Sequence, residues 1–487
     1  MKTIKSLIYI CLLSFAASCG NGWLDLEPST SIVDGDAPTL GKAEFTLNGI
    51  YNLMQSSDAY TGRMIYLGDV WGDDVQASST TKRTAKYYMM DYNKDNITSS
   101  FWRNPYEMIR NANMILSYID NIDITEDEHA DRDDFKGQAL ALRALAMFDL
   151  TRIYGYTYTK DQGQSLGVPI VKDVPQIDFK PRRNTVKECY DMIIGDLSQS
   201  ITLMKDSKRE NSNKGKLNKW SAMTLLSRVY LYCGKNTEAL NIAEDAIKGA
   251  QAKGFRLWTN AEYETGWSME FQPEVLFEIV NITTDGPGKE SMGYLCSKDG
   301  YGDMILTTGF MALLQEDKND IRHKAIKRIT DSKKNVTYYI NKYQPEGGEN
   351  IADANIPMFR MSELYLNAAE AAVKTGSNDK AVLYLDAIVG RANPEKTVKE
   401  TIVTLERVLT ERRKELFGEG HRSYDLLRNN MRIVRKDVSG SDATTSHLPL
   451  ETEAIDYDRS YYRCVLPVPK AEMDANPNMR DQQNPGY

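Results

Sequence analysis

Residues 401–430 read TIVTLERVLTERRKELFGEGHRSYDLLRNN, a stretch that predicts two helices joined by a glycine turn. Apolar residues recur at helical spacing through its first half, so one face of the first helix should pack on a core. Gly418 and Gly420 then relieve the backbone strain of a tight reversal, and a short second helix begins around Ser423. The residues expected on the apolar face are Ile402, Leu405, Leu409 and Leu416.

Arg412 falls on this apolar face, between Leu409 and Leu416. A buried guanidinium costs several kcal/mol unless carboxylates meet it, so the sequence predicts an arginine–carboxylate network that ties the two helices together. Nothing in the stretch is typical of a reaction centre. The expected network consists of Arg412, Glu415, Glu419 and Asp425, with Glu411 as a further acid within reach.

The pattern ERRKELFGEGHRSYDLLR at 411–428 resembles the C-terminal signature of the SusD/RagB family, outer-membrane nutrient-binding lipoproteins of Bacteroidetes. Three other parts of the chain are similar to the same family. They are LDLEP at 24–28, the order ALRALAMFDLTRIYG, LGVPIV and RNTVKECYDMIIGDL between 141 and 197, and the terminus VLPVPKAEMDANPNMRDQQNPGY at 465–487. The resemblance covers nearly the whole chain after its leader but has no motif match within the loop-rich inserts.

The first residues are typical of a bacterial secretory leader. A basic start with Lys2 and Lys5 precedes an apolar run at 7–15 that is too short to span a bilayer. Small residues then lead to Cys19, which resembles the acylated cysteine of a lipoprotein. The alternative is an ordinary signal peptide with an incidental cysteine, and Ala16 favours it because lipoproteins more often carry a larger aliphatic residue there.

The composition argues against several classes of function. The net charge is −8 without a basic stripe, which is unlike a nucleic-acid-binding protein. The histidines and cysteines show no metal-ligand spacing, so we expect no metal ion and no cofactor. No hydrolase, zinc-protease, phosphate-loop or dinucleotide motif is present, and the neighbouring Asp73 and Asp74 would diverge on most backbones. The sequence therefore predicts a protein that is not an enzyme.

Two stretches, 217–248 and 361–393, fit the template of a tetratricopeptide helix pair, in which small residues let two antiparallel helices approach closely. Their equivalent small residues, Ala239 and Ala381, are 142 positions apart, which is not a multiple of the usual repeat. We therefore expect a mainly α fold. Tetratricopeptide-like helix pairs should form a right-handed scaffold with long loop-rich inserts and a few short strands.

The expected organisation follows these patterns along the chain. It consists of a signal peptide at 1–18, a lipidated tether at 19–41, a helical region at 42–256 with a loop insert at 60–100, a loop and short-strand insert at 257–355, and a C-terminal helical region at 356–487. Within the second insert, EVLFEIV at 274–280 and VTYYINKY at 336–343 predict strands.

A sugar-binding surface needs aromatic rings for the C–H faces of a pyranose and polar side chains for its hydroxyls. Trp102 and Trp220 lie in helical patterns and are expected in the core, as is Trp258. Aromatic residues of the inserts are better candidates, because binding residues usually lie on loops. We expect the two inserts to converge on one exposed concavity. The candidate ligand residues are Trp71, Tyr87, Tyr88, Trp267, Tyr294 and Tyr301.

The family resemblance implies a cell-surface lipoprotein of the outer membrane, held there by lipid on Cys19. It implies that the protein binds oligosaccharide and delivers it to a TonB-dependent transporter of the SusC type. A second hypothesis remains open, in which the helix pairs bind a peptide or protein, as tetratricopeptide surfaces often do.

Overall fold

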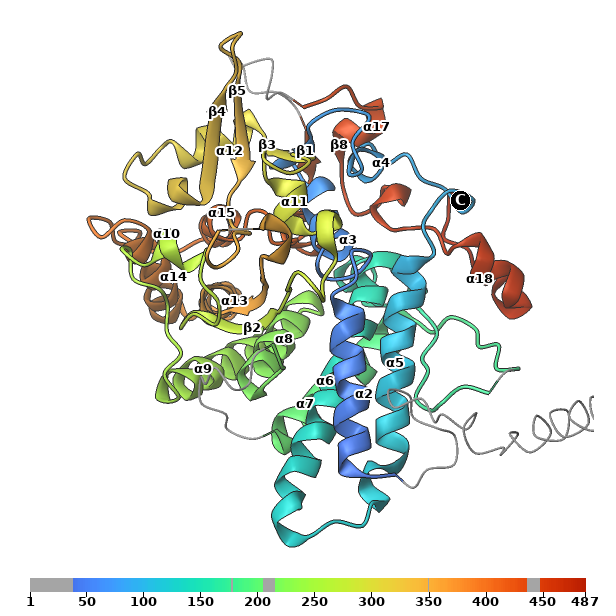
Figure 1. Cartoon of the computed structure of the whole chain (residues 1–487). Coiled ribbons are helices and arrows are strands. Elements are labelled where there is room, and N and C mark those ends of the chain that lie inside the picture. Colours follow the sequence, from blue (N-terminus) through green and yellow to red (C-terminus); the bar gives the residue numbers. More distant parts are fainter. Residues whose placement is uncertain (1–37, 177, 205–214, 349, 436–446) are drawn as a thin grey trace, which may run out of the picture.

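The computed structural model describes residues 38–176, 178–204, 215–348, 350–435 and 447–487, so the expected signal peptide and Cys19 lie outside it. Long helices form a bundle at one end of the molecule, and consecutive helices run antiparallel (Figure 1). Asn104, near the start of one helix, donates to Ser56 Oγ, just beyond the end of another, at 3.5 Å. The bundle consists of α2 (Leu40–Met54), α5 (Ser100–Tyr118), α6 (His129–Tyr154) and α7 (Val186–Leu203).

The start of α7 shows why this segment folds as a helix. The backbone N–H of Thr185 donates to the Glu188 carboxylate at 2.8 Å, and the N–H of Glu188 donates to Thr185 Oγ1 at 3.2 Å. This reciprocal capping box satisfies two backbone donors that the first turn leaves without a helical partner. A threonine followed three residues later by a glutamate is the sequence pattern of such a cap.

Two helix pairs follow the bundle and pack against each other. Arg228 pairs with Glu363 at 2.6 Å, and Asn367 donates to Ser227 at 2.8 Å, so both contacts join the two pairs inside the core. The prediction of two tetratricopeptide-like pairs separated by an insertion is confirmed, and the fold is mainly α. The pairs are α8 (Lys219–Tyr232) with α9 (Asn236–Ala252), and α13 (Met361–Lys374) with α14 (Asn378–Ala392).

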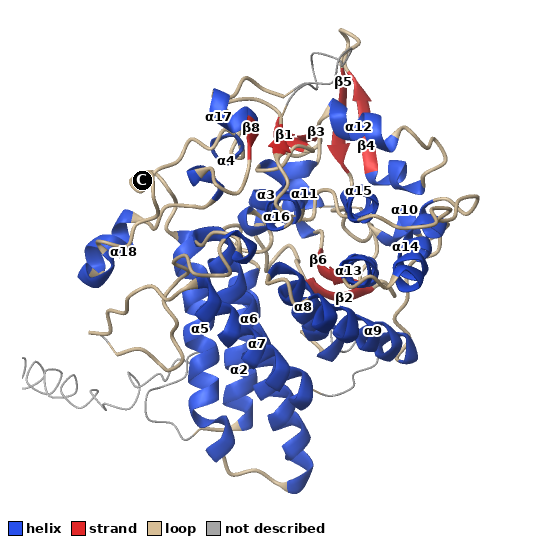
Figure 2. Cartoon of the chain, turned by 180° about the vertical axis from the view of Figure 1, so that it is seen from behind, coloured by secondary structure: helices blue, strands red, loops and turns tan. Residues whose placement is uncertain are grey.

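Short strands lie mostly at the end of the molecule opposite the bundle (Figure 2). A four-stranded sheet has the order β1-β3-β5-β4, with β1 (Val75–Ala77), β3 (Met304–Leu306), β5 (Val336–Ile340) and β4 (Ile326–Thr330). A second sheet pairs β2 (Val275–Ile279) with β6 (Ile356–Arg360), and a third pairs β7 (Ile433–Val434) with β8 (Asp456–Tyr457). The strands predicted at 274–280 and 336–343 are present as β2 and β5. Because β1 pairs with β3, the two inserts lie side by side.

The insert at 60–100 is more regular than its sequence suggests. It contains α3 (Arg63–Val70), β1 and α4 (Ala85–Tyr88), and most of its side chains are buried. Asp73 pairs with Arg422 at 2.7 Å, and Asp74 pairs with Arg413, so ion pairs to the C-terminal region hold the insert in the core. The expectation of a long irregular loop is wrong here. Ion pairs to residues far away in the sequence order this insert, so it lacks the local periodicity from which a helix or strand could be predicted.

The stretch quoted first folds as α15 (Leu405–Glu415), a turn, and α16 (Arg422–Arg428). Ile402 precedes α15 and is 72% exposed, so its expected place on the apolar face is wrong. Leu409 and Leu416 are buried as expected. No helix in the described ranges has the length and apolar character needed to cross a bilayer. The remaining short helices are α10 (Tyr263–Gly266), α11 (Met292–Cys296), α12 (Thr308–Leu314), α17 (Thr452–Ile455) and α18 (Lys470–Ala475).

Candidate ligand-binding site

The predicted Arg412 network exists, but its pairing is more selective than expected. Arg412 is buried and donates to both oxygens of Asp425, at 3.0 and 3.3 Å, and to Asn367 at 2.7 Å. Asp425 also accepts from Arg428 at 2.6 Å. Glu411, Glu415 and Glu419 pair with other cations, so only Asp425 among the acids expected for Arg412 meets it.

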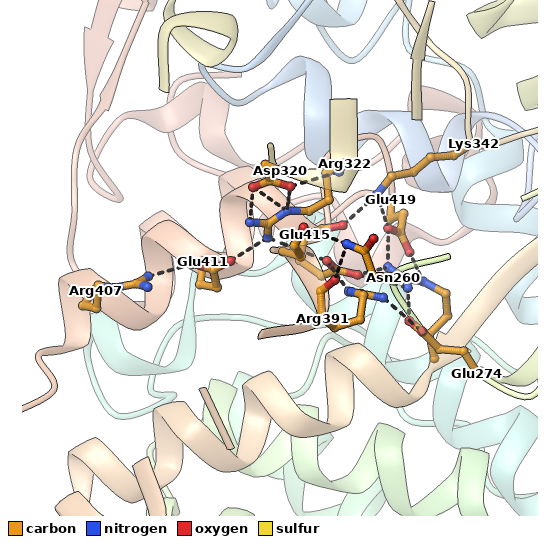
Figure 3. A network of polar contacts seen from close by, with 12 residues as sticks. Asn260, Glu274, Asp320, Arg322, Lys342, Arg391, Arg407, Glu411, Glu415 and Glu419 are labelled. Atoms are coloured by element: carbon orange, nitrogen blue, oxygen red, sulfur yellow. Dashed lines mark hydrogen bonds and ion pairs between the residues drawn. The ribbon is translucent and has the colours of Figure 1, made fainter. Parts of the chain in front are cut away.

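A second group of buried charges surrounds the end of α15, where carboxylates face cations from separate parts of the chain (Figure 3). Glu415 is fully buried and lies 2.6 Å from Arg391 and 3.3 Å from Arg360. Burial raises the pKa of the Glu415 carboxyl, but the charges of Arg391, Arg360 and Arg322 outweigh burial and lower this pKa to about 2. Glu415 is therefore ionised over the whole physiological range.

Lys342 completes this charged group. Its ammonium is buried and donates to Glu419 at 2.6 Å and to the backbone carbonyl of Glu415 at 2.7 Å. Burial lowers the pKa of Lys342 to about 8, although Glu419 opposes the shift. These side chains satisfy one another away from solvent, so the network stabilises the fold and offers no surface to a ligand.

Trp267 belongs to this network and is not a free ligand platform, which corrects the expectation from sequence. It is 5% exposed. Its ring centroid lies 4.8 Å from Lys342 Nζ, 4.8 Å from the guanidinium carbon of Arg360 and 5.1 Å from the Trp258 ring. The indole covers buried cations, and such a contact stabilises a desolvated cation by about 2 kcal/mol.

Trp71, Tyr87 and Tyr88 are likewise buried, so the expectation that they present faces to a ligand is wrong. Trp71 packs against Tyr92 and Tyr424. Tyr87 meets Phe101 edge to face at 5.5 Å. The ring of Tyr88 lies under the Arg435 guanidinium, and its hydroxyl contacts His447 Nδ1 at 2.8 Å. These rings pack in the core because ion pairs hold the backbone of the insert against the C-terminal region. The exposed fractions are 0% for Trp71, 4% for Tyr87 and 0% for Tyr88.

Tyr294 and Tyr301 remain as half-buried rings that reach the surface. They meet edge to face with 5.3 Å between ring centroids. The Arg83 guanidinium lies over Tyr301, with its carbon 3.6 Å from the ring centroid. The side chain of Arg83 is 40% exposed. Aromatic faces beside a planar hydrogen-bond donor are the features that hold a sugar ring and its hydroxyls.

Backbone contacts fix this cluster, which we call the tyrosine site (Arg83, Tyr294, Tyr301). The N–H of Tyr301 donates to the carbonyl of Tyr294 at 2.8 Å, and Lys82 Nζ donates to the carbonyl of Tyr301 at 2.5 Å. A Cβ on Gly300 would lie 2.4 Å from the Tyr294 carbonyl oxygen, so this close approach requires glycine. The two inserts are neighbours here, but Trp71, Tyr87 and Tyr88 of the first insert are buried, so the expectation that aromatic residues of both inserts share one exposed concavity is wrong.

Sequence reasoning missed two neighbours of the tyrosine site. Tyr339 of β5 lies against Gly302, where an added Cβ would be 3.0 Å from its ring. Lys327 of β4 is directly opposite Tyr339 in the sheet and pairs with Asp299 at 2.9 Å. The alternation of the predicted strand at 336–343 was the available signal, since it places Tyr339 and Ile340 on opposite faces.

Two surface grooves beside the bundle were also missed. One, of about 880 Å³, lies between the segment at 170–176 and α7. The other, of about 360 Å³, is lined by Trp102 and Tyr106 of α5 together with Pro175 and Phe179. The available signal was the sequence LGVPIVKDVP at 166–175, because closely spaced prolines favour extended backbone.

The described residues include no group of three His, Cys, Asp or Glu arranged to hold a metal ion. Cys189, Cys233, Cys296 and Cys464 are buried and unbridged, which is typical of cysteines that act as small core residues.

Comparison with known proteins identifies the family. A family model described as starch-binding and associating with the outer membrane matches residues 22–231, and the model of the SusD family matches residues 261–487. A solved structure from Bacteroides vulgatus, described as a candidate sugar-binding protein, is 56% identical with a TM-score of 0.88 and covers 93% of this chain and 99% of its own.

Two further relatives agree. A SusD superfamily protein from Bacteroides vulgatus is 36% identical with a TM-score of 0.84, over 93% of this chain and 100% of its own. SusD-like protein P38 from Formosa agariphila is 24% identical over 97% of this chain and 99% of its own length. The chain belongs to the SusD/RagB family.

Proposed function

We propose that the protein is a surface lipoprotein that binds oligosaccharide at the tyrosine site and delivers it to a TonB-dependent transporter of the SusC type. The observation that carries this proposal is the meeting of Arg83 from one insert with Tyr294 and Tyr301 from the other at the surface. The chain also matches a family model described as starch-binding, and it is similar to a protein described as a candidate sugar-binding protein.

The strength of binding can be estimated from the ring area. Covering ~100 Å² of apolar surface on one ring contributes at most about 2.5 kcal/mol. Two rings therefore give micromolar to millimolar affinity after the cost of association. Such affinity suits a protein that captures a nutrient and then releases it. This function needs no catalytic group and no cofactor.

The proposed membrane anchor and the proposed transporter partner are supported by the family and by the sequence of the leader. Lipid on Cys19 would hold the mature protein to the outer membrane, since no described helix can do so. A SusC-type transporter would receive the ligand. Peptide binding in the manner of a tetratricopeptide module is less favoured, because twelve of the fourteen residues of α8 are buried and leave no groove along that helix.

Retention on immobilised oligosaccharides, compared with retention on peptide pools, tests the proposal. The mature chain should bind at least one glycan and no peptide pool, and free oligosaccharide should elute it. Binding to peptides alone would overturn the proposal and favour the alternative.

A further inference from the structure

One hairpin of this acidic protein is strongly basic. The chain as a whole carries a net charge of −8, from 60 basic and 68 acidic residues. By contrast, the residues at 82–83, 289–303 and 327–334 carry +4, from eight basic and four acidic side chains. One of those acids, Asp303, is completely buried. We call the surface formed by these three segments the basic face.

Two ion pairs show that the three segments are neighbours. Arg83 pairs with Glu290 at 3.0 Å, which joins the first segment to the second. Lys327 pairs with Asp299 at 2.9 Å, which joins the second to the third. The basic face therefore begins at the tyrosine site and continues along the β4–β5 hairpin, which projects from the molecule (Figure 1).

The basic face has more cations than its own acids can neutralise. Arg328, Lys333 and Lys334 are exposed and form no ion pair with any described residue. Lys289, also exposed, has its ammonium 6.0 Å from the Tyr294 ring. Like charges held close together repel one another, and an anionic ligand would relieve this repulsion while the positive potential speeds its arrival.

We infer that the oligosaccharide bound at the tyrosine site carries anionic groups, such as uronic carboxylates or sulfates. The rings of Tyr294 and Tyr301 would contact the sugar faces. Lys327, which is opposite Tyr339 in the sheet, and the exposed Lys333 and Lys334 of the hairpin turn would bind acidic groups on units that extend along the hairpin. A neutral glycan would use only the rings. This inference rests on the proposed function and specifies its substrate class.

Charge reversal on the hairpin tests the inference. The double variant Lys327→Glu/Lys333→Glu should bind acidic oligosaccharides (oligogalacturonate, chondroitin sulfate and heparin fragments) about tenfold more weakly than the parent, because exposed ion pairs each contribute a modest amount. Raising the salt from about 0.05 M to about 0.5 M should weaken parent binding, because the Debye length falls to a few ångströms. The matched control Lys235→Glu/Lys248→Glu makes the same change of charge around α9 and should bind like the parent.

The outcomes separate the inference from the proposed function. Binding of neutral glucan or galactan oligomers but not of acidic ones would overturn the inference and leave the proposed function standing. The same conclusion would follow if acidic oligosaccharides bound equally well to the parent and to the charge-reversed variant. Failure to bind either class would overturn both. Binding to phosphatidylglycerol vesicles that the reversal abolishes, without glycan binding, would overturn both and assign the basic face to lipid.

Discussion

The guanidinium carbon of Arg83 lies 3.6 Å from the centre of the Tyr301 ring, although the two residues belong to different inserts. Arg83 also pairs with Glu290 at 3.0 Å, and its backbone N–H donates to buried Asp303 at 3.1 Å. The side chain is thus held in place while remaining 40% exposed. An arginine held this way can donate to sugar hydroxyls without first losing conformational freedom.

Replacing Arg83 should weaken glycan binding more than it weakens the fold. Arg83→Ala should lower affinity about tenfold, because hydrogen bonds to a charged group contribute about 1.5–3 kcal/mol. Arg83→Lys should retain part of the affinity, since it keeps the charge but loses the planar fork. Titration calorimetry measures both, with Arg256→Ala as a matched exposed arginine. Parent-like affinity in Arg83→Ala would remove Arg83 from the site.

Glu415 should make stability depend on pH in acid. Its folded pKa of about 2 lies below its ordinary value of 4.5, so its contribution is present above about pH 4.5 and is lost as the pH falls towards 2. The shift corresponds to a contribution on the order of 3 kcal/mol. Urea unfolding should show Glu415→Gln destabilised at pH 7, with the difference from the parent shrinking in acid. A constant difference from pH 7 to 3 would contradict this account, and Glu395→Gln serves as an exposed control.

Trp267 should matter for stability and not for ligand binding. Trp267→Ala should lower the free energy of unfolding by about 3–5 kcal/mol, because it opens a cavity beside Lys342 and Arg360. Affinity for glycan in the folded fraction should stay unchanged. A large loss of affinity at parent stability would show that the ligand reaches this ring.

Cys19→Ser should release the secreted protein from the membrane fraction. Cys19 is the expected lipid attachment point, and no helix among the described residues is long and apolar enough to cross a membrane. Fractionation of cells followed by immunoblotting checks the result. A variant that still needs detergent for extraction would show that another part of the chain holds it.

Much of the architecture could be predicted from local pattern. Helical periodicity and small residues located both helix pairs, and Thr185 with Glu188 located the start of α7. The burial of Arg412 followed from its position between Leu409 and Leu416. These features depend on residues close together in sequence, which is why a single sequence reveals them.

The site was harder to predict because burial of the inserts depends on distant residues. Asp73 and Asp74 looked like surface residues of a loop, but Arg422 and Arg413 bind them and draw Trp71 into the core. No local pattern distinguishes Trp71 from Tyr301, since both lie in polar, aromatic segments. Their difference comes from partners more than 200 residues away, which only the folded structure brings into contact.

The central claim is that Tyr294 and Tyr301 form the ligand platform, and a comparison of two double variants tests it most directly. Tyr365 and Tyr384 form a matched pair on the helix pairs, edge to face at 6.0 Å. Calorimetric titration with one bound oligosaccharide should show no measurable binding to Tyr294→Ala/Tyr301→Ala and parent-like binding to Tyr365→Ala/Tyr384→Ala. If the first variant, still folded, bound as tightly as the parent, the tyrosine site would not be the ligand site.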